Sequence, residues 1–340
     1  MLYNGGITGK EWEAMPMCTA VTYTSGAHYF GRNLDLDRAY GERVVIAPRA
    51  FPFPFRRVPA AHRHYALIGM ALVADGYPLY YDATNEKGLS MAGLNFPASA
   101  DYKPEREGWD NVAPFEFIPW LLGQCANLIE AREALSRVNL IRLPFSPRLP
   151  LAPLHWLIAD PSGAIVVESL REGLKIHDNP AGVLTNEPPF DYQMFRLNDY
   201  MQLTREAPRN TFAKGLDLRP YCLGMGATGL PGDLSSSSRF VRAAFTRLNA
   251  VSGPSEAEGV SQFFHILDSV AQTRGCARAE GDRYEITVYS SCCNVDRGIY
   301  YYTTYENRQI TGVDMHREDL DGSALASYPL ITQQQFRFQN

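Results

Sequence analysis

The order of strand-like and helical segments is the feature that most constrains the fold of this chain. Residues 18–94 contain short runs rich in Val, Ile and Tyr that are broken by Gly, Pro and Asp, a pattern typical of strands. Further strand-like runs lie at 154–186 and 285–306. Helical stretches separate these parts, at Phe115–Cys125, Leu128–Val138, Ser238–Leu248 and Val260–Val270. This order favours an α+β sandwich in which sheets pack on each other and the helices lie outside.

The composition excludes several classes of protein. The 340 residues are 45% hydrophobic and carry a net charge of −5 without a basic block, so nothing indicates nucleic acid or an anionic membrane surface as a partner. No apolar run approaches the ~20 residues of a membrane span, and residues 1–17 lack the apolar core of a secretion signal. The six cysteines include no CxxC pair, and the seven histidines show no metal-site spacing. We therefore expect a cytoplasmic protein that binds no metal.

Cys18 stands at the start of the strand-like run CTAVTY, close to the N-terminus. If the residues before it are removed, Cys18 carries both a thiol and a free α-amine, whose reference pKa is ~7.7–8.0. Such an amine can serve as a base beside its own nucleophile, which makes a self-contained acyl-transfer centre. The alternative is a small buried hydrophobic residue, and the run CTAVTY alone favours that alternative.

Two further segments bear on function. Gly224–Gly229 matches GxGxxG, but no hydrophobic strand precedes it and Pro231 follows at once, so we interpret it as a glycine-rich loop rather than a nucleotide site. The apolar, proline-rich run LPFSPRLPLAPLHW at 143–156 cannot form a regular helix or a central strand. Because such a loop is costly to leave in water, we expect it to cover another part of the molecule.

Five polar residues are unusual for a core sequence. Arg32 and Asp35 end the strand-like run after that of Cys18, and Asn95 lies between apolar neighbours in AGLNFP. Asn186 ends the run GVLTN, and Arg239 opens a predicted helix in SSSSRFVR. Each alone has an ordinary structural interpretation: a surface ion pair, two turn residues, and a helix-start residue on the wet face.

Together these residues and the blocks around them resemble the choloylglycine hydrolase family, which comprises bile salt hydrolases and penicillin V acylases with the N-terminal nucleophile fold. The resemblance covers Cys18 to about Ile331, with MCTA, YFGRNLD, NEKGLSMAGLNFP, LHW, GVLTN, GLPGD, SRFVR, FFHIL and GIYYYTTYEN in order. It implies a four-layer αββα sandwich and a single hydrolase domain over 18–340. It also implies that residues 1–17 are a leader or upstream extension that is removed.

The resemblance implies a role for each polar residue. The nucleophile falls on Cys18, the oxyanion groups on Asn95 and Asn186, and the other active-site residues on Arg32, Asp35 and Arg239. The chemistry agrees, because the two arginines stabilise a thiolate and Asp35 can orient the terminal amine. The side chain of Asn186 and the backbone N–H of Asn95 can stabilise an oxyanion. This chemistry needs no cofactor.

The substrate is expected from one residue and from apolar segments. Penicillin V acylases resemble one another in carrying tyrosine where this chain has Asn95, whereas bile salt hydrolases carry asparagine. Glycine- or taurine-conjugated bile salts are therefore the expected substrates, and penicillin V is the enzymatic alternative. Leu34, Phe53, Leu143 and Phe145 could line a steroid-sized pocket, and plain core packing is the alternative for them.

Two expectations concern the whole protein. A chain that kept its leader would not expose the amine, so a bile-acid or lipid-binding protein is the non-catalytic alternative. The family is often tetrameric, so the resemblance implies a homo-oligomer, although the sequence itself carries no separate oligomer signal.

Overall fold

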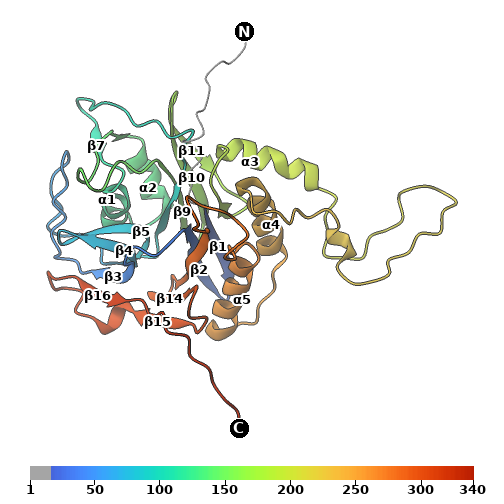
Figure 1. Cartoon of the computed structure of the whole chain (residues 1–340). Coiled ribbons are helices and arrows are strands. Elements are labelled where there is room, and N and C mark those ends of the chain that lie inside the picture. The colour runs from blue at the N-terminus through green and yellow to red at the C-terminus, as the bar shows by residue number, and fades with distance from the viewer. Residues whose placement is uncertain (1–16) are drawn as a thin grey trace.

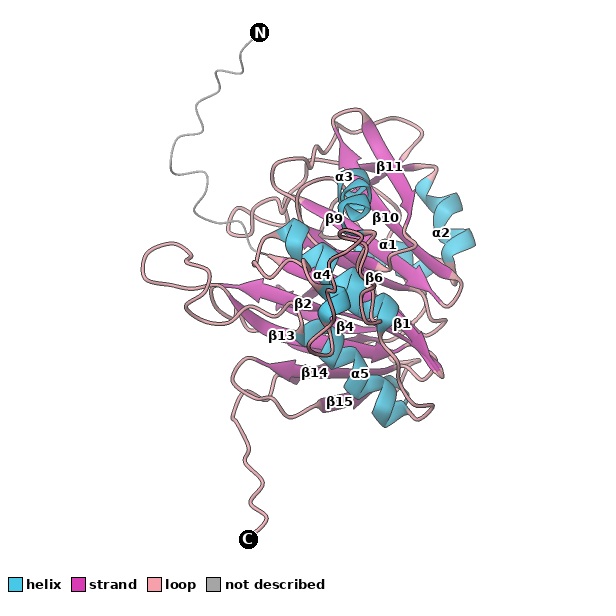
Figure 2. Cartoon of the chain, turned by 90° about the vertical axis from the view of Figure 1, so that its right-hand side faces the viewer, coloured by secondary structure: helices cyan, strands magenta, loops and turns pink. Residues whose placement is uncertain are grey.

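Two antiparallel sheets lie face to face, and helices cover their outer faces (Figures 1 and 2). The computed structural model describes residues 17–340, so the expected leader lies outside the described residues except for Met17. The first sheet has six strands, in the order β12 (Val183–Leu184), β1 (Cys18–Ser25), β2 (Ala27–Leu36), β13 (Ile286–Asn294), β14 (Ile299–Thr304) and β15 (Thr311–Asp314). The second has eight, in the order β11 (Gly173–Asp178), β10 (Gly163–Leu170), β9 (Leu154–Asp160), β6 (Ser90–Asn95), β5 (Tyr77–Asn85), β4 (Leu67–Ala74), β3 (Arg43–Ala47) and β16 (Ala326–Pro329).

The helices complete four layers. Helices α4 (Ser236–Asn249) and α5 (Glu256–Asp268) pack on β1, β2 and β13 of the six-stranded sheet. Helices α1 (Phe117–Gln124) and α2 (Leu128–Leu135) pack on β4, β5, β6 and β9 of the other sheet. The αββα sandwich predicted from the sequence is thus confirmed. The remaining elements are α3 (Phe190–Arg196), the short parallel pair β7 (Asp110–Val112) and β8 (Val138–Leu140), and the 3-10 helices η1 (Leu197–Tyr200), η2 (Met225–Ala227) and η3 (Met315–Arg317).

Alternation along the strands of the eight-stranded sheet builds two cores. Successive residues of a strand point to opposite faces, so Val44 and Ile46 join the core between the sheets while Val45 and Ala47 join the core beneath α1 and α2. Both faces of this sheet are therefore buried, which explains why its central strands read as nearly continuous apolar runs.

Capping side chains set the starts of the helices earlier than apolar periodicity indicates. The periodic residues of α5 begin at Val260, but the helix begins at Glu256, because Ser255 and Glu258 form a reciprocal capping box. In the same way α4 begins at Ser236, where the Ser235 hydroxyl accepts the Ser238 N–H.

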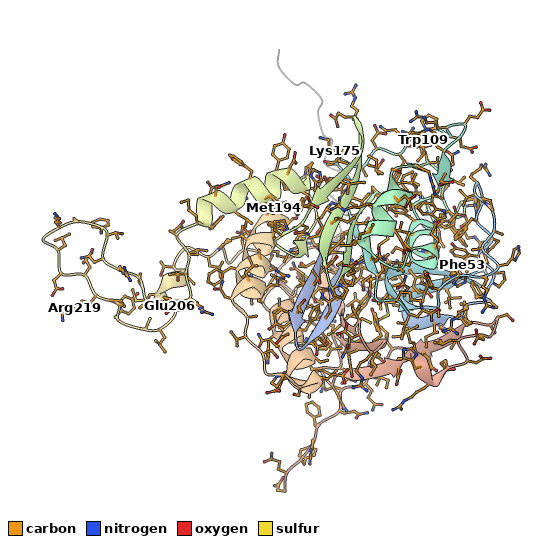
Figure 3. The ribbon with its side chains drawn as sticks, turned by 180° about the vertical axis from the view of Figure 1, so that it is seen from behind. Phe53, Trp109, Lys175, Met194, Glu206 and Arg219 are labelled. Atoms are coloured by element: carbon orange, nitrogen blue, oxygen red, sulfur yellow. The ribbon has the colours of Figure 1, made fainter. Side chains whose placement is uncertain are left out.

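Residues 201–235, between η1 and α4, form a loop that projects from the body of the protein (Figures 1 and 3). Glu206 and Arg219 mark it in Figure 3, at a distance from the sheets. The GxGxxG segment Gly224–Gly229 lies in this loop, around η2 and without a preceding strand. The interpretation of that motif as a loop is therefore confirmed. Among the described residues no helix combines the length and the apolar character that crossing a membrane requires.

Gly259 allows α5 to lie close to β2, and Gly259→Ala should therefore lower stability. A Cβ at position 259 would lie 2.3 Å from the Tyr29 hydroxyl oxygen, and Tyr29 is buried. We expect a loss of ~1–3 kcal/mol from overpacking, despite the higher helix propensity of alanine. Urea unfolding measures this, with Gly232→Ala as the control, since a Cβ there meets nothing within 4 Å. Equal stability of the Gly259→Ala and wild-type proteins would contradict the close approach.

Candidate active site

Cys18 lies where β1 begins, and β2 and β12 flank it within the six-stranded sheet. The β1–β2 register pairs Cys18 with Leu34 and Ala20 with Arg32. Cys18 is buried, with 3% of its surface exposed. Burial raises the pKa of its thiol, while the positive charges of Arg32 and Arg239 oppose that rise. The alternative of a purely apolar cysteine does not fit these charged neighbours.

The side-chain amide of Asn186 connects three segments of the chain. Its Oδ1 accepts the backbone N–H of Cys18 at 2.8 Å and an N–H of Arg239 at 2.8 Å. Its Nδ2 donates to the carbonyl oxygen of Asn95 at 2.8 Å. The two asparagines, 91 positions apart in sequence, are thus in direct contact at the end of β6 and just after β12.

Arg239 is fully buried in the first turn of α4, which excludes the alternative of a helix-start residue on the solvent-exposed face. Its Nη1 donates to the carbonyl oxygen of Cys18 and to the Thr19 hydroxyl, both at 2.6 Å. Burial lowers its pKa, and Asp35 and Cys18 act in the opposite direction. Arg239 therefore ties the start of α4 to the start of β1.

Arg32 and Asp35 are also fully buried, which excludes the interpretation as a surface ion pair. Arg32 Nη1 donates to the carbonyl oxygens of Gly93 and Tyr81, on the facing sheet. Asp35 Oδ1 accepts the Thr287 hydroxyl at 2.7 Å, and its Oδ2 has no hydrogen-bond partner among the described residues. Burial raises the pKa of Asp35 to about 6, against the effects of Arg239, Thr287 and Arg32.

Sequence reasoning missed two buried carboxylates. Asp82 accepts the hydroxyls of Tyr289 at 2.9 Å and Tyr300 at 2.7 Å. Burial raises the pKa of Asp82, and the charge of Arg32 lowers it. Glu285 accepts the backbone N–H of Met17, and burial raises the pKa of Glu285 to about 8. Asp82 could have been predicted as a buried carboxylate, because it is an acidic residue inside the apolar run YPLYYDATN. Glu285 lies just before a strand, where no sequence pattern predicts its burial.

An apolar cavity lies beside Arg32. Tyr81 and Gly93, whose carbonyl oxygens Arg32 contacts, line it together with Leu143 and Phe145. The proline-rich run contributes further lining through Pro144, Leu149, Pro150, Leu151, Ala152 and Leu154. The loop thus covers this cavity.

The other two expected pocket residues lie elsewhere. Phe53 is completely buried and packs against Phe51, Phe55 and Tyr77, and Leu34 belongs to the core between the sheets. Both fit the core-packing alternative. Within residues 17–340 no group of three or more His, Cys, Asp or Glu side chains is placed to hold a metal ion.

Known proteins resemble this chain in sequence. The profile of the linear amide C–N hydrolases, choloylglycine hydrolase family, matches residues 18–328. A bile salt hydrolase/transferase of Lactiplantibacillus plantarum is 54% identical over 320 residues, which are 94% of this chain and 99% of that protein. One of the same name from Clostridium perfringens is 38% identical and covers 92% of this chain and 96% of its own length.

Solved structures agree with these relatives. A variant of the conjugated bile acid hydrolase from Clostridium perfringens superposes with a TM-score of 0.88 at 36% identity and covers 95% of this chain and 100% of its own. Penicillin V acylase from Agrobacterium tumefaciens has a TM-score of 0.69 at 19% identity, covers 92% and 90%, and shows likeness of fold alone. The fold is therefore that of the N-terminal nucleophile hydrolases, and the chain belongs to the choloylglycine hydrolase family of linear amide C–N hydrolases.

Proposed function

We propose that this protein is a bile salt hydrolase that cleaves the amide bond of glycine- or taurine-conjugated bile acids. The observation that carries the proposal is the hydrogen-bonded cluster of Cys18, Asn186, Arg239 and Asn95. Tyr81 and Gly93, whose carbonyl oxygens accept hydrogen bonds from Arg32, also line an apolar cavity. The names of the relatives support the substrate class.

The mechanism needs Cys18 to be the first residue of the working protein. Its α-amine then takes the thiol proton, and Sγ attacks the amide carbon of the substrate. The amine returns the proton to the leaving nitrogen, the C–N bond breaks, and glycine or taurine departs from a thioester. Water attacks the thioester carbon, gives a proton to the amine, and releases the bile acid as the thiol is restored. A different amine in place of water would receive the acyl group, in line with the hydrolase/transferase names of the relatives.

Two asparagines supply the oxyanion donors in this proposal. A primary amide carries two N–H bonds; Asn186 uses one for the Asn95 carbonyl oxygen, and the other can face the tetrahedral oxyanion. The backbone N–H of Asn95 is the second donor. Such neutral donors typically contribute ~10²–10³ in rate each when they are held in place.

The charges in the site favour a thiolate. Burial would lower the pKa of Arg32, but Cys18, Tyr289, Asp82 and Asp35 raise it above the ordinary value. Arg32 therefore stays charged, and the two arginines favour the thiolate and oppose the rise in the Cys18 pKa that burial causes. Asp35 orients the amine through its unpartnered oxygen.

The substrate class rests on Asn95 and on the cavity. The backbone carbonyl of Asn95 binds Asn186 through an atom that every residue type has. The tyrosine of penicillin V acylases therefore differs from Asn95 in its side chain only. The cavity that Leu143, Phe145 and the proline-rich run line suits the apolar face of a steroid. Penicillin V hydrolysis stays the enzymatic alternative. The cytoplasmic location stays a prediction.

Expression followed by intact-mass analysis and a glycocholate assay tests the mechanism. We expect a mass that begins at Cys18, together with hydrolysis of glycocholate. Cys18→Ala should fold as the wild type does by circular dichroism and should not turn over, and residual activity within about tenfold of wild type would reject the nucleophile. An active species that retains a residue before Cys18 would overturn the mechanism. An inactive, leader-retaining protein that binds bile acid would favour the non-catalytic alternative.

Substrate ranking tests the choice between the subfamilies. We expect a far higher kcat/KM for glycocholate or taurocholate than for penicillin V. The Asn95→Tyr variant keeps the backbone N–H and changes only the side chain, so it should shift the ratio toward penicillin V without abolishing turnover. A wild-type preference for penicillin V would instead assign the protein to the alternative.

Asp82 balances the charge of Arg32 in this proposal, and Asp82→Asn should therefore destabilise the protein. We expect a loss of ~3 kcal/mol in the free energy of unfolding, because a buried arginine loses its counter-charge. Tyr300→Phe is the matched control: it removes one hydrogen bond to Asp82 and should cost only ~1 kcal/mol. Urea denaturation at neutral pH measures both. An Asp82→Asn protein no less stable than Tyr300→Phe would show that the charge of Asp82 does not matter.

We further propose that the protein is a homo-oligomer, a tetramer by family resemblance. In support, the projecting loop exposes several large apolar side chains, namely Met201, Phe212, Tyr221 and Leu223. Light scattering after size-exclusion chromatography should give a multiple of the mass of a single chain, as measured by the intact-mass analysis. The Tyr221→Asp/Leu223→Asp variant should dissociate while it keeps its circular dichroism spectrum. A wild-type monomer would refute the proposal.

A further inference from the structure

His155 lies directly behind the point where Asn95 and Asn186 meet. It is fully buried on β9, opposite Leu94 of β6 in the strand register. It does not touch Cys18 or the arginines in any hydrogen bond of the described residues, so the mechanism above gives it no part. Its two sets of contacts nevertheless reach both proposed oxyanion residues through their chain neighbours.

The ring of His155 joins the two segments that carry the oxyanion donors. It stacks on Phe96, the residue after Asn95, with ring centroids 4.1 Å apart and planes 6° from parallel. Its Nε2 lies 2.8 Å from the carbonyl oxygen of Thr185, the residue before Asn186. Because a carbonyl oxygen only accepts, Nε2 carries the hydrogen and donates it.

Glu168 holds the other ring nitrogen of His155. His155 Nδ1 lies 3.0 Å from Glu168 Oε1, and two lone pairs would repel at this distance, so a proton lies between the two atoms. The same oxygen accepts the backbone N–H of Phe190 at 3.0 Å, which holds the carboxyl group in place. The other titratable group near the pair is His177, whose Nε2 lies 3.7 Å from Glu168 Oε2.

The pair is poorly explained as a stabilising contact. Both side chains are completely buried, and an apolar pair of similar volume would fill this space without the cost of removing ionisable groups from water. The pair instead fixes the orientation of the His155 ring, which stacks on Phe96 and points its Nε2–H at the Thr185 carbonyl oxygen. Orientation of a histidine by a carboxylate in this manner is how proteins hold a donor at one position.

We propose that His155 and Glu168 are positioning residues that hold the two oxyanion-hole segments in register. This inference rests on the proposed function. Stacking of the His155 ring on Phe96 fixes the position of the neighbouring Asn95. The hydrogen bond from Nε2 to the Thr185 carbonyl oxygen fixes the position of the neighbouring Asn186. The hydrogen bond from Asn186 Nδ2 to the Asn95 carbonyl oxygen links the two segments directly. Oxyanion stabilisation demands donors held in place before the reaction, so their loss of register lowers the rate.

His155→Phe tests the inference, because phenylalanine keeps the stack on Phe96 and removes the N–H to Thr185. We expect kcat for glycocholate to fall at least ~10-fold, with KM changed by less than about threefold, since the bile acid cavity is not lined by these residues. His155→Phe/Glu168→Leu should show the same loss and avoids leaving Glu168 buried without a partner. Asn186→Ala serves as the reference for complete loss of that donor.

Rescue variants and a matched control separate positioning from plain packing. Glu168→Gln can donate to Nδ1 and so keeps the Nε2–H tautomer, and it should retain most of the wild-type kcat. His155→Gln can place an N–H near Thr185 and should recover part of it. The control is His28→Gln, because His28 is also a buried histidine and is bonded to Thr22 and Thr24 at the far end of the β1–β2 hairpin. It should lower the melting temperature and leave kcat and KM unchanged.

A crystallographic comparison decides the inference even without activity. In the His155→Phe/Glu168→Leu protein, the distance between Asn186 Nδ2 and the Asn95 carbonyl oxygen should exceed the hydrogen-bond limit of ~3.5 Å, and in His28→Gln it should not. A wild-type protein that does not cleave glycocholate would reject the proposed function but leave this readout intact. Unmoved asparagines, or an unchanged kcat in an active enzyme, would overturn the inference.

Discussion

The side-chain amide of Asn186 is the contact on which the candidate site depends. Both its oxygen and its nitrogen are engaged, and the partners come from the start of β1, the first turn of α4 and the end of β6. No other side chain of the described residues that we assign to the mechanism links both sheets and a helix. Since a buried amide that lost one of these partners would keep an unsatisfied polar atom, the amide enforces the relative positions of the nucleophile, one arginine and the second asparagine.

Charge sets the second constraint on this site. Arg32 and Arg239 are completely buried, and an isolated buried cation is too costly to persist. Asp35 and Asp82 therefore accompany them, one near the α-amine position and one on the facing sheet, held by the hydroxyls of Thr287, Tyr289 and Tyr300. The site is thus a buried cluster in which carboxyl groups accompany the two arginines around the thiol of Cys18.

Much of the fold could be predicted from sequence because its central strands and amphipathic helices have strong periodic patterns. The edge elements could not. β11 is half exposed and polar, and β16 ends in a proline, so each depends on pairing with a neighbour rather than on its own pattern. Helix α3 is one short element with few buried residues and was not expected either.

For the site, recognisable sequence blocks predicted six residues, and hydrogen bonds join four of them, Cys18, Asn95, Asn186 and Arg239, in one cluster. The catalytic roles of all six stay predictions. Asp82, Glu285 and the pair His155–Glu168 escaped for a physical reason. Their roles depend on which atoms they contact, and these partners lie on other segments of the chain: 30 positions away for His155 and Thr185, 207 for Asp82 and Tyr289, and 268 for Glu285 and Met17. No local sequence pattern shows such contacts. The same limit applies to Phe53, whose place in the core depends on aromatic neighbours.

The contact between Met17 and Glu285 has a consequence for maturation. With residue 17 still attached, the amide of Asn186 already has its full set of partners, and Asp35 N–H binds the carbonyl oxygen of Met17 at 3.0 Å. The hydrogen bonds of the site are therefore in place while Met17 is still attached, so the proposed removal of the upstream residues is not needed to form them. Cutting it would exchange a neutral amide for an ammonium group beside two carboxylates, so activation would be a local change of electrostatic potential and not a rearrangement of the chain.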